Sequence, residues 1–155
     1  DQKELIEKLI AQVGLSEFID KKVETFSKGM KQRLQIARAL LNNPKVIFLD
    51  EPSIGLDPVG AKELRELIKK LSKEGVTILL TTHYMPEAEE LCDRIAIIKK
   101  GKLLAIDDVV GLQNLVSNER KEEIKAKKEC EQEEKNKKNL EITLEDIYIE
   151  LLGDA

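Results

Sequence analysis

Aromatic residues are scarce in this sequence, and their scarcity narrows the kinds of ligand that it is expected to bind. The 155 residues include no Trp, and the aromatic share is only 3%. Stacking platforms for single-stranded nucleic acid are therefore not expected. The formal net charge is −4, so the chain has no overall basic field that would attract nucleic acid. We expect no nucleic-acid partner.

Cysteines and long apolar runs are also few. Cys92 and Cys130 lie far apart and form no CxxC pair, so we expect reduced thiols rather than a disulfide. No apolar run reaches transmembrane length, and the first ten residues do not have the pattern of a signal peptide. Any association with a membrane is thus expected to need a membrane partner.

Charged residues are abundant by contrast, at 36% of the chain. Residues 119–139 form a mixed-charge run of low complexity, which predicts a solvated helix or a disordered linker. A partner-binding helix is the alternative reading of that run. Apolar spacing returns in residues 140–153, which we expect to fold back as a terminal helix.

The first 44 residues have helical patterns. Apolar residues fall on one face of residues 2–13, and Gly14 is expected to end that helix. Ser27 is the predicted N-cap of a second helix, which Asn42, Asn43 and Pro44 should stop. The apolar residues that recur at helical spacing in this second helix are Met30, Leu34, Ala37, Leu40 and Leu41.

Strand and helix patterns alternate from residue 45 onward. The apolar runs at 45–49 and 76–82 suit parallel strands that are buried on both faces. Between them, residues 59–73 predict an amphipathic helix. Two further runs, 94–98 and 102–106, flank a Lys-Lys-Gly turn and predict a hairpin. This order indicates an α/β fold with a mostly parallel sheet flanked by helices. The apolar stripe of the helix predicted over residues 59–73 consists of Leu64, Leu67, Ile68 and Leu71.

Polar residues follow both predicted parallel strands. Asp50 and Glu51 follow the first strand, and Thr81, Thr82 and His83 end the second. Ligands of open parallel sheets bind beyond the carboxyl ends of the strands, so neighbouring strands would bring these groups together. Phosphoryl transfer to water needs such a set: an Asp for Mg²⁺, a second acid for the attacking water, and a neutral donor near the γ-phosphate.

Four ordered motifs make the sequence resemble the C-terminal part of an ABC transporter ATP-binding subunit. They are FSKGMKQRLQIARALLNNP, similar to the signature motif and its helix; KVIFLDEP, similar to the Walker B strand; SIGLDP, similar to the D-loop; and TTHYMPEAEELCDRIAII, similar to the switch-histidine region. The resemblance covers residues 12–108 well and residues 142–153 moderately. It implies the P-loop NTPase fold of the ABC ATPase type.

The resemblance implies ATP as the nucleotide and Mg²⁺ as its ion. By this resemblance, Asp50 would take the Mg²⁺ role and Glu51 would take the role of general base. His83 is expected to contact the γ-phosphate. Asp57 is expected to cross a dimer interface and to couple two nucleotide sites.

The signature residues are implied to act on the nucleotide of the opposite subunit, where Ser27 and Gly29 would contact the γ-phosphate. Ser27 begins a helix, whose free N–H groups and dipole favour an anion, and Gly29 permits close backbone approach. The commonest signature has two glycines and then Gln after its Ser, whereas this chain has Lys28, Gly29 and Met30. Lys28 could face phosphate or remain solvated. Met30 resembles the drug-export and sodium-export branch.

The resemblance also implies partners and a location. We expect a membrane-spanning permease and a second ATP-binding subunit, identical or different. The protein would then be cytoplasmic and peripheral on the inner face of the membrane. Residues 1–44 would end the helical subdomain with the signature helix, 45–108 would be the C-terminal part of the ATPase core, and 109–155 would be an extension.

The phosphate-binding loop is the motif that these residues lack. No GxxxxGK[ST] pattern occurs in them, and that loop normally cradles the phosphates. We therefore expect a portion of the ATPase fold that is incomplete at the N-terminus. Alone, it should bind ATP weakly and be inactive, and its strands would lack neighbours.

Three alternatives remain open. The C-terminal lobe of a DNA-maintenance ATPase also carries these motifs without a phosphate loop. Such a lobe should follow apolar heptads, whereas residues 1–26 show one short amphipathic helix broken by Gly14. A regulatory module without turnover is the second alternative, although Glu51 and His83 argue against it. A translation-associated member with two ATPase halves is the third.

Overall fold

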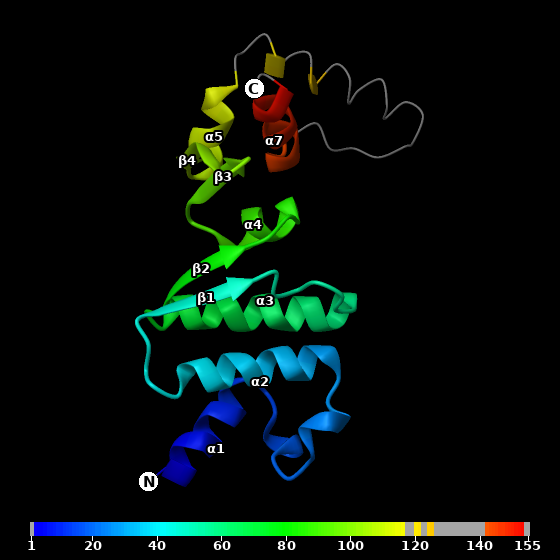
Figure 1. Ribbon diagram of the computed structural model, residues 1–155, viewed down its shortest axis with the longest axis vertical. Helices are drawn as coiled ribbons and strands as arrows, with labels where there is room; N and C mark the ends of the chain where they lie inside the picture. Colours follow the sequence, from blue (N-terminus) through cyan, green and yellow to red (C-terminus); the bar gives the residue numbers. More distant parts are fainter. Residues whose placement is uncertain (1, 117–119, 122–123, 126–141, 154–155) are drawn as a thin grey trace. The chain divides into compact units, whose positions relative to one another are not determined.

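The computed structural model divides into two compact units, residues 1–83 and residues 84–155, which are described separately below (Figure 1). Among the described residues, no helix is long and apolar enough to cross a membrane. The three-part division expected from the sequence remains a prediction. The structure describes residues 2–116, 120–121, 124–125 and 142–153.

The first unit begins with two helices, α1 (Gln2–Gln12) and α2 (Lys28–Leu40). Two short 3₁₀ turns, Ser16–Phe18 and Val23–Thr25, connect them. The predicted end of α1 at Gly14 is confirmed within two residues. The N-cap prediction for α2 is confirmed as well, because the Oγ atom of Ser27 accepts the Met30 N–H at 3.2 Å.

The apolar faces of these two helices are narrower than the sequence predicted. Leu9 is buried in α1, but Leu5 and Ile6, one turn earlier, are exposed. In α2 the prediction fails at Leu41, which is 41% exposed, because the helix ends at Leu40 and Leu41 lies beyond its last turn. The buried residues of α2 are Ile36, Ala37 and Leu40.

The two parallel strands are β1 (Val46–Asp50) and β2 (Thr77–Thr81), which pair with Asp50 opposite Thr81. The helix between them in sequence is α3 (Pro58–Lys73), which lies between the strands and α2 (Figure 1). The predicted apolar stripe of α3 is confirmed, since each of its members is buried. These members are Leu64, Leu67, Ile68 and Leu71.

Burial of these strands on both faces is a prediction that the structure contradicts. Ile47 and Leu49 of β1 are buried, but Phe48, on the opposite face, is 74% exposed. Leu79 of β2, the register partner of Phe48, is also exposed. In the described part of this unit the sheet has two strands. One face is therefore buried and the other is open, because burial depends on what covers each face rather than on the apolar run itself.

The described residues of the second unit include a hairpin and several helices. The hairpin prediction is confirmed: β3 (Ile95–Lys99) and β4 (Lys102–Asp107) are antiparallel. Its two turn residues, Lys100 and Gly101, both have positive φ, which matches the twist of paired strands. The helices of this unit include α4 (Met85–Leu91), α5 (Val109–Leu115) and α7 (Leu144–Gly153).

The predicted terminal helix is confirmed as α7, which packs on the core of its own unit. The sequence did not predict α5, a seven-residue helix whose N-cap, Asp108, accepts the Gly111 N–H at 2.7 Å. The charged run at 119–139 lies almost entirely outside the described residues. The buried core of this unit consists of Ala88, Ile95, Ile97, Leu112, Val116, Leu144 and Ile147.

Cys92 is a free thiol at the end of α4, as predicted. Burial raises the pKa of this thiol, and the nearby carboxylates of Asp93 and Glu87 raise it further. The thiol form, which is the less reactive one, is therefore favoured. Cys130 lies outside the described residues.

Candidate functional site

The carboxyl ends of β1 and β2 form the candidate site. Asp50 is the last residue of β1, and its register partner Thr81 is the last residue of β2. The hydroxyl of Thr81 donates a hydrogen bond to Oδ1 of Asp50. The predicted proximity of these polar groups is confirmed. The hydrogen bond itself was not predicted, because the sequence does not fix the register of two strands 31 residues apart.

Glu51 turns away from the strand direction just after Asp50. Its φ is +45°, a value that is uncommon for a residue with a side chain. The Glu51 N–H still donates to the Thr81 carbonyl oxygen at 2.9 Å, so the sheet pairing extends one residue past β1. Such backbone conformations concentrate at functional sites, where the surrounding structure holds them.

His83 meets Glu51 across the strand ends. The Nδ1 atom of His83 lies 2.8 Å from Oε1 of Glu51. A carboxylate can only accept a hydrogen bond, so Nδ1 carries the proton. In a neutral ring Nε2 is then an acceptor, and in a protonated ring it is a second donor. The His83 side chain is 73% exposed, so a ligand could reach its ring.

The loop after Glu51, residues 52–57, leads directly into α3. The Ile54 N–H donates to the Glu51 carbonyl at 3.2 Å, and the Leu56 N–H donates to the Ser53 carbonyl at 3.1 Å. Gly55 has a φ of +68°, a conformation that a side chain would strain. The two hydrogen bonds close two overlapping turns, so the loop is compact between Glu51 and Leu56.

Asp57 ends this loop and caps α3. Its Oδ1 accepts the N–H groups of Val59 and Gly60, each at 3.0 Å. The hydrogen bond from Gly60 is the main cause that lowers the pKa of the Asp57 carboxyl. Sequence reasoning gave Asp57 a contact across a dimer interface and missed this capping role, which the Asp-Pro pair at a helix start indicates. The contact across the interface remains a prediction.

The start of α2 lies against the same loop. The side chain of Lys28 reaches across Gly55, and Leu56 is in ordinary van der Waals distance of the space beside Gly29. Ser27, Lys28 and Gly29 are thus placed next to residues 52–57 within one unit. Their contacts with a nucleotide of another subunit remain a prediction.

A metal site built from protein ligands alone is not found in the described residues. No group of three or more His, Cys, Asp or Glu side chains there could hold an ion. Mg²⁺ needs no such group, because it is commonly bound by one or two carboxylates together with substrate phosphates and water. Asp50, held by Thr81 at the strand end, fits that kind of site.

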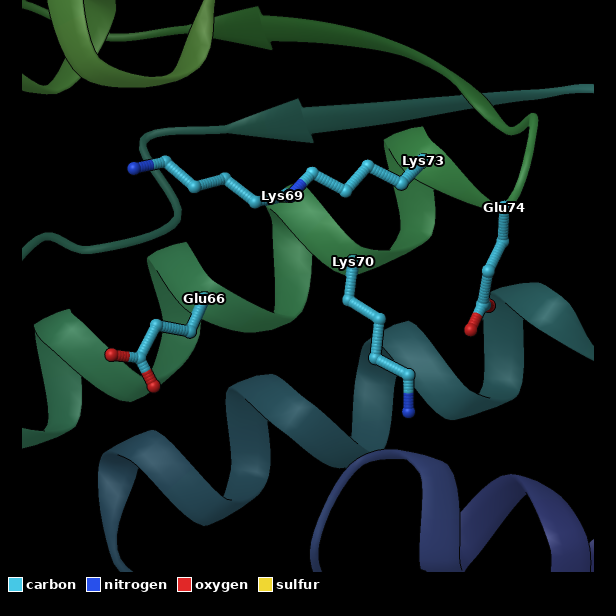
Figure 2. A pocket seen from close by; sticks show the side chains of 5 residues that line it. All are labelled: Glu66, Lys69, Lys70, Lys73 and Glu74. Atoms are coloured by element: carbon cyan, nitrogen blue, oxygen red, sulfur yellow. The ribbon is translucent and has the colours of Figure 1, made fainter.

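A surface hollow on α3 is separate from these residues. Figure 2 shows its five lining side chains, which do not converge on one point. None of the predicted site residues is among them, and all five belong to the charged face of α3 and the residue that follows it. The hollow therefore adds nothing to the candidate site. Its lining residues are Glu66, Lys69, Lys70, Lys73 and Glu74.

Comparison with known proteins points to one family. Residues 1–54 match the family model described as ABC transporter. The fluoroquinolones export ATP-binding protein of Mycobacterium tuberculosis is 47% identical over 105 residues, which are 68% of this chain and 35% of that protein. The lantibiotic transport ATP-binding protein SrtF of Streptococcus pyogenes is 46% identical over 107 residues, or 69% of this chain and 47% of that protein. The chain thus spans less than half the length of these relatives.

Solved structures agree with the sequence relatives. The ADP conformation of MJ1267, an ATP-binding cassette of an ABC transporter, has a TM-score of 0.65 and 28% identity, and the match covers 69% of this chain and 42% of that one. A nucleotide-free ATP-binding cassette from an ABC transporter has a TM-score of 0.66 and 27% identity over the same shares. The predicted fold class is therefore confirmed. The chain is a relative of the ATP-binding proteins of ABC transporters, and it has part of the ABC ATPase fold.

Proposed function

We propose that these residues belong to a subunit that hydrolyses ATP to power an ABC exporter. The observation that carries the proposal is the contact between Glu51 and His83 beside Asp50, at the ends of two adjacent parallel strands. Relatives named for fluoroquinolone export and linearmycin resistance support the direction of transport.

Each group at the strand ends has a chemical task in this proposal. Asp50, oriented by Thr81, would hold Mg²⁺, which when bound neutralises charge on the phosphate oxygens. Glu51 would take a proton from the attacking water as its oxygen bonds to the γ-phosphorus and the bond to the ADP oxygen breaks. His83 would hold the Glu51 carboxylate through Nδ1 and turn Nε2 toward the γ-phosphate.

The remaining predicted residues would act in an assembly. Ser27 and Gly29 would face the nucleotide of a second ATP-binding subunit, identical or different, and Asp57 would lie at the interface between them. Closure of the two subunits around ATP would drive a membrane-spanning permease. The protein would then lie on the cytoplasmic face of the membrane, held there by the permease.

The test is ATP hydrolysis by the full-length protein carrying Glu51→Gln. Loss of a general base should slow hydrolysis on the order of 10²-fold or more, while ATP binding is retained. Glu66→Gln is the matched control, because it makes the same chemical change on the exposed face of α3. Equal hydrolysis by the parent and Glu51→Gln would remove Glu51 from this role. A parent protein without any turnover would favour a regulatory module instead.

A further inference from the structure

Lys28 and Gly55 are in contact although they belong to different motifs. The outer part of the Lys28 side chain occupies the space where a side chain on Gly55 would begin. Its Cε and Cδ atoms lie 3.6 and 3.8 Å from the position that a Cβ of residue 55 would take, and Nζ is closer still. The absence of a side chain at Gly55 is what makes room for Lys28.

Further contacts place the start of α2 against the same region. Leu56 Cδ2 lies 3.8 Å from the position of a Cβ on Gly29, which is ordinary contact distance. One turn along α2, Arg33 Nη1 lies 3.5 Å from Oε2 of Glu63 on α3. Gly29 and Arg33 are four residues apart and thus share one face of the helix. This face of α2 rests on the loop and on the helix that the loop leads into.

We propose that Lys28 is a positioning residue whose aliphatic stem packs on Gly55 and holds the loop of residues 52–57 against the start of α2. The stem atoms Cδ and Cε lie within ordinary contact distance of the Gly55 Cβ position, so the stem covers Gly55 together with the ammonium group. The contact would make Ser27 and Asp57 move together toward a second subunit. The effect of the contact on ATP hydrolysis rests on the proposed function, whereas the contact itself does not.

The first test measures the loop without any activity. The amide protons of Ile54 and Leu56 are hydrogen-bonded inside the loop, so their exchange with solvent reports how often the loop opens. Lys28→Ala should speed exchange at both by several-fold. Lys28→Met should leave exchange near the parent rate, because Met is unbranched and of similar length. The amide of Leu112, in the other unit, is the internal control.

Two results would overturn the proposal. Unchanged loop exchange in Lys28→Ala would mean that the side chain does not hold the loop. Equal acceleration in Lys28→Met and Lys28→Ala would mean that the ammonium group, and not the stem, makes the contact.

A double-mutant cycle gives a second, independent readout. Gly55→Ala imposes backbone strain whichever residue stands at position 28, but it displaces the side chain only where Lys28 is present. It should therefore accelerate loop exchange by a larger factor in the parent than in the Lys28→Ala background. An equal factor in both backgrounds would contradict the contact.

The effect of Lys28 on ATP hydrolysis is tested in the full-length ATPase. Lys28→Ala should lower kcat on the order of tenfold, as expected when an assembled site is loosened by less than an ångström. ATP affinity of the separate subunit should not change. An unchanged kcat, in a protein whose Glu51→Gln variant is inactive, would reject the role of Lys28 and leave the proposed function intact.

Discussion

The imidazole of His83 and the carboxylate of Glu51 lie 2.8 Å apart although 32 residues separate them in the sequence. Their strands end side by side, and the positive φ of Glu51 accompanies this meeting. A conformation that is locally unfavourable is retained where the surrounding structure fixes it. The contact gives the Glu51 carboxylate a set direction before any nucleotide arrives.

The proton on His83 is expected to sit on Nδ1 in the neutral ring. Nitrogen-15 NMR of the imidazole distinguishes the two tautomers, and the parent should show mainly the Nδ1–H form. Glu51→Gln should keep this preference because the Gln amide oxygen still accepts. The Glu51→Ala variant should lose the preference for the Nδ1–H form, because Ala offers no side-chain acceptor. A parent ring protonated mainly on Nε2 would show that the contact does not form in solution.

Ser27→Ala should have two separable effects. Loss of the hydrogen bond to Met30 should lower the free energy of unfolding by about 1 kcal/mol, the usual cost of removing an N-cap. In the full-length protein, closure of two subunits around ATP should weaken, while ATP still binds to a separate subunit. Ser27→Thr keeps the cap and serves as the control. Loss of ATP binding in the separate Ser27→Ala subunit would contradict a role across the dimer.

Asp57 should contribute a stability that depends on pH. Its folded-state pKa is lowered by the N–H groups of Gly60 and Val59. The contribution is therefore fully present above the ordinary carboxyl pKa of about 4 and is lost as the pH falls through the lowered folded value. Thermal unfolding of Asp57→Asn, which keeps a capping oxygen, should lack this part of the acid dependence. Identical acid profiles for the parent and Asp57→Asn would contradict the cap.

The apolar stripe of α3 should carry much of the stability of the first unit. Leu64 is 1% exposed, whereas Val59 on the same helix is 66% exposed. Leu64→Ala should lower the free energy of unfolding by about 2–5 kcal/mol. Val59→Ala should change it by about 0.5 kcal/mol or less. Denaturant unfolding measures both, and equal effects would show that α3 does not pack through this stripe.

Features set by local periodicity could be predicted from the sequence. The stripe of α3, the cap at Ser27 and the strands before Asp50 and His83 each depend on a few neighbouring residues. The prediction that both strand faces are buried was wrong at Phe48, because the burial of this side chain depends on what covers the sheet. The contact of Lys28 with Gly55 depends on how α2 packs, which no short pattern reveals.

Two missed features had weak local signals. The helix α5 has only seven residues, too few for a clear period, and only the cap at Asp108 indicated it. In the sequence, Thr81 is one of three polar residues at the end of the second strand. Its hydrogen bond to Asp50 follows from the register of β1 and β2, which the sequence leaves open.

The most direct test of the proposed function is the position of the nucleotide in a structure of the full-length Glu51→Gln protein with Mg·ATP. We expect Mg²⁺ at Asp50, a water between residue 51 and the γ-phosphate, and Nε2 of His83 within hydrogen-bond distance of that phosphate. A γ-phosphate bound away from the ends of β1 and β2 would contradict it.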